Sequence, residues 1–288
     1  MDERDALTAR FQEQRGHLRA VAYRMLGSSS DAEDAVQEAW LRLDRVDAGS
    51  LDNLAGWLRT VVTRICLDML RSRRSRREDL TGDVPEPAGD DHPEEEALRA
   101  DSVSRALLVV LNTLEPAERV AFVLHDMFAV PFDQIAPVLE RTPVATKKLA
   151  SRARHKVRGT PAVPPADLAR QQRVVAAFLA AARAGDLDAI LAVLAPDVVR
   201  RADPAALPPG AATEVRGARP VAEGTVLLAG RARLAEPALV DGVVGAVVAP
   251  GGRLLFAVTF TVEDDRITAY DVIADPDRLR RLNLAVLR

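Results

Sequence analysis

The sequence predicts a multidomain protein: two all-α helical domains, the second with a helix-turn-helix, and then an α+β domain. Apolar residues recur at helical spacing in the first part of the chain, whereas β-branched runs appear only near its end. A chain of 288 residues with 48% hydrophobic content can bury several cores. The predicted parts are helical domain 1–77, linker 78–101, helical domain 102–158, linker 159–165 and α+β domain 166–288.

The first domain is predicted to contain three helices. Gly27 ends one helix, and Ser30 with Glu33 forms a capping box at the start of the next. A third helix is expected over 51–73, where the apolar residues again follow helical spacing. The region is therefore predicted to be a small helical bundle.

The segment 78–101 reads as a flexible acidic linker. It holds ten acidic residues and one arginine, together with Pro85, Pro87 and Pro93. Such a composition buries too little apolar surface to offset the entropy lost on ordering. Without this segment, residues 1–160 hold 23 basic and 17 acidic side chains, so the helical domains are basic although the whole chain has a net charge of −3.

The second domain is predicted to contain four short helices, with Pro116 and Pro143 at the starts of two of them. Residues 132–139, a turn at 140–143 and a helix over 144–158 have the proportions of a helix-turn-helix. The side chains expected to pack the two helices together are Ile135, Leu139, Ala145 and Leu149. A plain helical bundle remains the alternative for this segment considered alone.

The texture of the chain changes after the Pro-rich linker 159–165. Two helices are expected, one to about Ala184 and one from Asp186 to Leu194. Strands follow over 243–248, 254–262 and 267–273, separated by turn residues at 250–252 and 264–265. These elements predict an α+β domain with a curved antiparallel sheet.

Several classes of protein are excluded by composition. Cys66 has no partner for a disulfide, and the four histidines are too scattered to suggest a metal site. The N-terminus does not resemble a signal peptide, and no stretch approaches the length of a membrane span. We therefore expect a cytoplasmic protein that needs no metal or cofactor and does not bind a membrane.

Two clusters of basic residues are candidate DNA-contacting surfaces. One ends the third helix and consists of Arg71, Arg73, Arg74, Arg76 and Arg77. The other spans 141–158, with seven Lys and Arg residues and no acid. A single cluster of this kind would read as a solvated helix face, but two clusters on two helical domains favour binding to nucleic acid.

The residues of both helical domains resemble a known family. Residues 22–42 (AYRMLGSSSDAEDAVQEAWLR) and 54–71 (LAGWLRTVVTRICLDMLR) are similar to region 2 of extracytoplasmic-function (ECF) sigma factors. Residues 111–124 (LNTLEPAERVAFVL), with the helix-turn-helix that follows, are similar to region 4 of that family. The resemblance implies a protein that binds core RNA polymerase and promoter DNA.

The resemblance also implies which residues act. The clamp helices of the polymerase β′ subunit would be met by Asp34, Gln37, Glu38 and Leu41. The −10 element would be met by Trp57, Arg59, Arg64, Arg71, Arg73 and Arg74, since aromatic and guanidinium planes stack on unpaired bases. The −35 element would be met by Lys147, Lys148, Ser151, Arg152 and Arg154. For Trp40 and Trp57 taken individually, a core role is favoured.

The last part of the chain resembles the cone-shaped SnoaL-like (NTF2-like) domain of one subgroup of these sigma factors. The resemblance implies two regulatory motifs, one made of Pro85, Glu86 and Pro87, and one made of Asp275, Pro276, Asp277, Arg278 and Leu279. The chain departs from the subgroup at two places: Asp83 stands where the subgroup has tryptophan, and Pro204 to Ala206 stand where it has glycines after the residue matching Asp203.

Catalysis by this domain is not expected. No His, Cys, Ser or Lys follows Arg158, so nucleophilic triads and imidazole relays are excluded there. Asp197, Asp203 or Asp271 could serve as acid or base, but each is more typical of a turn or cap. We expect the domain to regulate the sigma domains, with a small ligand in its cone as a candidate effector. The alternatives are an operator-binding helix-turn-helix regulator and a sigma-like protein whose cone has acid–base activity.

Overall fold

The computed structural model describes residues 3–46, 53–79 and 105–287. It divides into two compact units. The helical unit contains the described residues up to 79 together with Leu114–His155, and the sheet unit contains the helix at Arg105–Asn112 together with Lys156–Arg288. The motif of Pro85, Glu86 and Pro87 and nearly all of the acidic linker lie outside the described residues.

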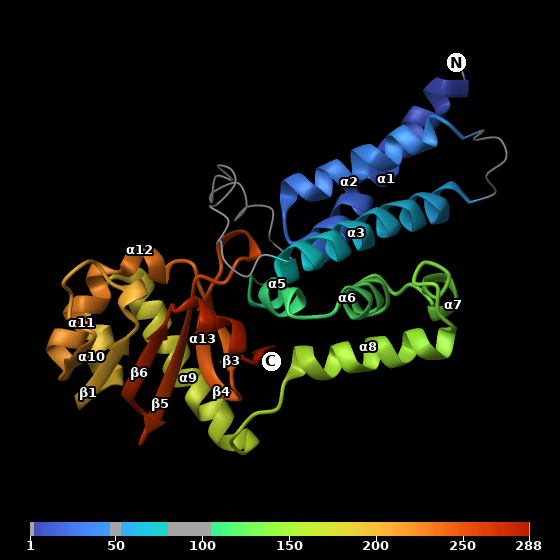
Figure 1. Cartoon of the computed structure of the whole chain (residues 1–288). Helices are drawn as coiled ribbons and strands as arrows, with labels where there is room; N and C mark the ends of the chain where they lie inside the picture. Colours follow the sequence, from blue (N-terminus) through green and yellow to red (C-terminus); the bar gives the residue numbers. More distant parts are fainter. Residues whose placement is uncertain (1–2, 47–52, 80–104, 288) are drawn as a thin grey trace. The chain divides into compact units, whose positions relative to one another are not determined.

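The three helices predicted for the first domain are present and pack on one another (Figure 1). They are α1 (Glu3–Leu26), α2 (Ser29–Leu43) and α3 (Leu54–Asp79), and Gly27 adopts a φ of +74° between the first two. The N-cap of α2 is Ser28 rather than the predicted Ser30, because the Ser28 Oγ accepts a hydrogen bond of 3.3 Å from the amide of Asp31.

The rest of the helical unit is formed by short helices. They are α6 (Pro116–Phe122), a π-helical turn η2 (Val123–Met127), α7 (Phe132–Ile135) and α8 (Pro143–Arg158). Proline opens both α6 and α8, as predicted. The first helix of the helix-turn-helix is shorter than expected, since α7 ends at Ile135 and turns lead to Glu140, whose φ is +53°.

The buried face of α8 is shifted by one residue from the prediction. Ala145 and Leu149 are only half-buried, and the face turned inward consists of Thr146, Ala150, Ala153 and Val157. Ile135 and Leu139 are buried as expected. The face of α8 left in solvent is therefore also displaced, which matters for the basic residues that it carries.

The sheet unit combines helices with one seven-stranded sheet. Its helices are α5 (Arg105–Asn112), α9 (Pro165–Ala184), α10 (Leu187–Val193), α11 (Ala218–Leu227), α12 (Ala229–Ala232) and α13 (Pro276–Arg281), with 3₁₀ turns η3 (Pro204–Ala206) and η4 (Pro250–Gly252). Its strands are β1 (Leu194–Ala202), β2 (Glu214–Arg216), β3 (Ala235–Val240), β4 (Val243–Val248), β5 (Phe256–Glu263), β6 (Arg266–Ile273) and β7 (Leu284–Val286). The predicted α+β class is confirmed.

The strand order is β2-β1-β6-β5-β4-β3-β7. The sheet is antiparallel except that β1 runs parallel to β6, which corrects the fully antiparallel sheet expected from the sequence. Asp264 and Asp265 both have positive φ and close the tight β5–β6 hairpin, a conformation that Asp tolerates better than most residues. The strands β4, β5 and β6 match the three predicted β-branched runs.

Helix α9 packs against the sheet (Figure 1). Aromatic rings from both lie in the apolar core between them. The ring centroids of Phe178 on α9 lie 5.4 Å from Phe260 and 5.6 Å from Tyr270 on the sheet. The Tyr270 hydroxyl lies 3.0 Å from Thr225 Oγ1, so its polar end is hydrogen-bonded inside an apolar core.

The sheet unit also holds a helix that precedes the helix-turn-helix in sequence. Helix α5 packs against β7, β3 and η4, and the Asn112 side-chain amide donates a 2.7 Å hydrogen bond to the carbonyl of Gly252. The sequence instead grouped α5 with the rest of 102–158. The predicted linker 159–165 is also attached to this unit, since the Ala162 amide donates a 2.8 Å bond to Gly242 O.

Two further observations concern the described part of the chain as a whole. None of its helices is both long and apolar enough to cross a membrane, and none of its His, Cys, Asp and Glu side chains gather in threes as a metal site would require. Cys66 is buried in the helical unit, and burial raises the pKa of its thiol to about 12. The side chain therefore serves as core packing.

Candidate functional site

The four residues predicted to meet a polymerase lie along one face of α2. Asp34, Gln37, Glu38 and Leu41 follow the i, i+3, i+4, i+7 spacing that aligns side chains on a helix. Asp34 and Gln37 are exposed, and Leu41 keeps 47% of its surface in solvent, which is high for a large apolar residue. The Glu38 carboxylate accepts a 2.9 Å hydrogen bond from Arg42 Nε. The face is an acidic surface with one exposed leucine at its end.

Gln37 also lines a cavity of about 150 Å³ between α1 and α2. Its walls include Phe11, Val36 and Trp40, and the Phe11 and Trp40 rings lie 4.8 Å apart between centroids. Trp40 is half-buried and packs on Phe11. The cavity thus adjoins the α2 face.

The arginines of α3 fall into distinct groups. Arg64 and Arg71 are exposed, and Arg71 lies 3.8 Å from Asp68 on the same helix. Arg73 instead pairs with Asp31 and donates a 3.2 Å hydrogen bond to the carbonyl of Leu26. It therefore fastens α3 to the α1–α2 turn, a structural task that the sequence did not predict.

Two further arginines were predicted to contact DNA. In the structure their side chains form bonds with the segment that carries the helix-turn-helix. Arg59 Nη2 donates a 2.8 Å hydrogen bond to Gln134 Oε1, and Arg74 pairs with Glu115. The Phe128 ring also approaches α1, with the Arg24 guanidinium 5.1 Å from its centroid. Trp57 is half-buried. Within the helical unit, the side chains of Arg59 and Arg74 are thus occupied by protein partners.

The basic residues of α8 also divide into two groups. Arg152 Nε lies 3.0 Å from Glu118 on α6, and Arg154 Nε lies 2.5 Å from Asp126 on η2. Lys147, Lys148 and Ser151 are exposed on the outer face of the helix. The lysines are therefore available to a partner, whereas the two arginines hold α8 to the preceding helices.

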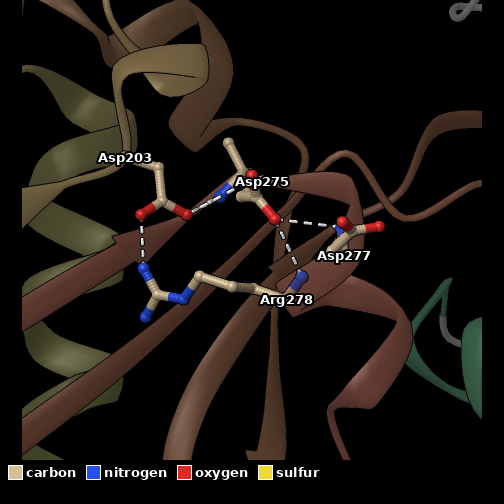
Figure 2. Close-up of polar contacts among 5 residues, drawn as sticks. Asp203, Asp275, Asp277 and Arg278 are labelled. Atoms are coloured by element: carbon tan, nitrogen blue, oxygen red, sulfur yellow. Dashed lines mark hydrogen bonds and ion pairs between the residues drawn. The ribbon is translucent and has the colours of Figure 1, made fainter.

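Two motifs of the sheet unit meet in space although they are far apart in sequence (Figure 2). One carboxylate oxygen of Asp203 accepts hydrogen bonds of 3.0 Å from the amides of Ala274 and Asp275, and the other pairs with Arg278. The Asp275 carboxylate caps α13 by accepting 2.9 Å bonds from the amides of Asp277 and Arg278. The structure thus joins Asp203 to the start of the motif 275–279.

The electrostatics of Asp203 follow from these contacts. Partial burial alone would raise the pKa of its carboxyl group. The hydrogen bonds from Asp275 and Ala274 and the charge of Arg278 outweigh burial, and hold that pKa below its ordinary value. Asp203 is consequently ionised at neutral pH and serves as an anchor for the 275–279 motif.

Replacement of this anchor has a predicted cost. We expect Asp203→Ala to destabilise the sheet unit by about 2–3 kcal/mol at pH 7, because bonds to a charged group contribute on that scale. Since folding lowers the pKa, this contribution is present above the ordinary Asp pKa of 3.8 and is lost as the pH falls below it. Urea denaturation at pH 7 and pH 3 measures both effects, with exposed Asp197→Ala as control. Equal midpoints for Asp203→Ala and the native chain at pH 7 would contradict the assignment.

The positions of the candidate acid and base residues in the sheet unit do not favour acid–base catalysis there. Asp203 is committed to the anchor, Asp197 is exposed, and Asp271 is half-buried on β6. Burial raises the pKa of the Tyr270 hydroxyl, and its hydrogen bond to Thr225 opposes that shift. None of these groups pairs with a second carboxylate in the described residues as an acid–base dyad would.

The residues that sequence reasoning missed are mainly the partners of the basic side chains. Glu118 is buried although charged, and it faces Arg152 from 34 residues away along the chain. Glu115, Asp126 and Gln134 are also partners of arginines. The sequence carried no local signal for these pairs, because contacts between distant segments leave no local periodicity.

Both helical segments match protein families. Sigma-70 region 2 matches residues 11–76, and sigma-70 region 4 matches residues 104–157. The second match includes α5, which the structure groups with the sheet unit.

Similarity to known proteins extends over most of the chain. The ECF RNA polymerase sigma factor SigJ of Mycobacterium tuberculosis is 43% identical over 286 residues, which cover 93% of this chain and 91% of that protein. The probable ECF RNA polymerase sigma factor SigI of the same species is 38% identical and covers 70% of this chain and 72% of its own length. The crystal structure of M. tuberculosis SigJ has 38% identity and a TM-score of 0.46, and covers 94% of this chain and 98% of that one.

Proposed function

The chain belongs to the extracytoplasmic-function RNA polymerase sigma factors, and we propose which of its surfaces bind polymerase and which bind promoter DNA. A sigma factor binds core RNA polymerase and directs it to promoters, where transcription begins. We propose that the α2 face formed by Asp34, Gln37, Glu38 and Leu41 binds the clamp helices of the β′ subunit. In this proposal α3 meets the −10 element, and the outer face of α8 meets the −35 element. Binding to core polymerase would place the protein in the bacterial cytoplasm.

The observation that carries the proposal is the exposed stripe on α2. Its acidic and amide groups suit a basic coiled coil, and Leu41 offers an apolar contact that charge alone would not supply. Its position on a helix of a rigid three-helix bundle fixes the relative places of the four side chains.

For α3, the proposal requires a rearrangement. Arg64 and Arg71 are exposed and could meet DNA as they stand. Arg59 and Arg74 would first have to release Gln134 and Glu115. Exchange of these protein contacts for phosphate or base contacts would couple promoter engagement to separation of α3 from the α6–α7 segment.

We further propose that the sheet unit modulates activity through α5. This helix lies within the segment that matches sigma-70 region 4, yet it packs on β3, β7 and η4. Whatever changes this packing would change how the helix-turn-helix is attached to the rest of the chain. The short connection through residues 159–162, which is also bonded to the sheet unit, keeps the two parts at high local concentration.

The test is transcription in vitro with core polymerase on promoter libraries. Promoter-specific transcripts from the full chain support the division of surfaces, whereas tight duplex binding without polymerase and without transcripts would favour a simple operator-binding regulator. Asn112→Ala, which removes the bond to Gly252, is expected to change transcription several-fold while leaving polymerase affinity intact. Thr268→Ala, which removes a side-chain hydrogen bond to a backbone carbonyl between β6 and β5, is the matched control. Equal transcription by both variants and the native chain would overturn modulation through α5.

Comparing transcription by the full chain with transcription by a chain that ends near Arg158 is a less direct test of regulation. The truncation would remove the sheet that covers α5, so loss of activity could reflect an uncovered apolar helix rather than loss of regulation.

A small ligand in the cone also stays a prediction: its polar group would have to engage the buried pair of Thr225 and Tyr270. No catalytic role is assigned to the domain.

A further inference from the structure

The outer face of α8 carries an apolar side chain among its basic ones. Val144 keeps 68% of its surface in solvent at the second position of the helix. Lys147, Lys148 and Ser151 follow it at i+3, i+4 and i+7, so the four side chains form one exposed stripe. The opposite face, which begins at Thr146, is buried.

The helix is firmly placed beneath this stripe. Thr142 Oγ1 accepts a 3.2 Å hydrogen bond from the Ala145 amide, and Thr146 Oγ1 donates a 3.1 Å bond to the Thr142 carbonyl. Arg152 and Arg154 tie later turns to Glu118 and Asp126. The direction in which Val144 points is therefore fixed by the fold rather than by flexibility of the first turn.

The composition of the stripe suits the major groove of DNA. A lysine can bond to phosphates or to the O6 and N7 atoms of guanine, and a hydroxyl can bond to several bases, so neither recognises thymine specifically. An exposed β-branched apolar group gains nothing from water. The C5-methyl group of thymine is the apolar feature that the major groove offers.

We propose that Val144 contacts the C5-methyl group of a thymine in the −35 element and thereby selects that base. The inference rests on the proposed role of α8 and adds a specificity-determining residue to it. Lys147 and Lys148, one turn further along, would hold the backbone on either side and bring Val144 to the groove.

Substitution of thymine by deoxyuridine tests this contact, because it removes the methyl group and keeps the base pairing. Polymerase reconstituted with the full chain is assayed for binding to a selected promoter in which each −35 thymine is replaced in turn. One replacement is expected to weaken binding about four-fold, as loss of one buried methyl-sized contact predicts. Val144→Ala should weaken binding to the thymine promoter by a similar factor and become indifferent to that replacement.

The controls separate this inference from the proposed function. Lys148→Ala should weaken binding to every template and retain the deoxyuridine effect. If Val144→Ala keeps the full deoxyuridine penalty, or if no replacement affects the native chain, the inference is wrong although α8 still binds DNA. If the native chain recognises no promoter at all, the proposed function fails and this inference fails with it.

Discussion

Leu41→Asp is expected to lower promoter-specific transcription by reconstituted polymerase about 30-fold or more. Leu41 is the exposed apolar residue of the α2 face, and truncation of an interface residue that dominates binding costs at least about 2 kcal/mol. Here the carboxylate would in addition have to leave water upon binding. Titration of core polymerase with the labelled chain measures the affinity directly, and transcription should fall in parallel.

The matched control is Leu227→Asp. Leu227 lies on α11 in the sheet unit and is 86% exposed, so the same substitution there changes charge and hydrophobicity without touching α2. Circular dichroism confirms that both variants are folded. If Leu41→Asp bound core polymerase as tightly as Leu227→Asp, the α2 face would not be the polymerase-binding surface.

The second large effect is expected from Lys147→Ala with Lys148→Ala. Loss of two phosphate contacts should weaken promoter binding roughly ten-fold at physiological salt, and should reduce the slope of log affinity against log salt by about two. The measurement is a salt titration of promoter binding by reconstituted polymerase. Because both lysines are exposed, the variant should fold like the native chain.

Arg219→Ala, an exposed arginine of α11, provides the control for a general change of charge. It should leave the salt slope unchanged. An unchanged slope for the double lysine variant would show that α8 does not face the phosphates, and the −35 assignment would have to be abandoned.

Strands β1 and β7 and the buried face of α8 were not predicted correctly from the sequence. Strand β1 was missed because Leu194–Ala202 contains a proline and three charged residues, and so lacks the alternation that marks a half-buried strand. Strand β7 is three residues long and too short for any periodic signal. In α8 the buried face was misplaced by one residue, because the bulky Leu149 was expected to lie inside; it is only half-buried, whereas the smaller Thr146 and Ala150 are buried.

The predicted site shows the same limit more sharply. The α2 face was predictable because its four residues share one helix, and helical spacing alone aligns them. The ion pairs of Arg73, Arg152 and Arg154 could not be predicted, because their acidic partners lie 42, 34 and 28 residues away in the chain. A local basic run looks alike whether its charges bind DNA or hold two helices together.

The place of α5 has a consequence for biosynthesis. Apolar residues of the helix are buried in the folded protein, among them Leu108, Val109 and Leu111, yet β7, against which it packs, is synthesised long after it. At bacterial elongation rates the ribosome needs about 10–35 s to travel from Asn112 to Leu284. During that interval the nascent chain presents an uncovered apolar helix, so this protein is expected to depend on chaperones that attend the ribosome until β7 emerges.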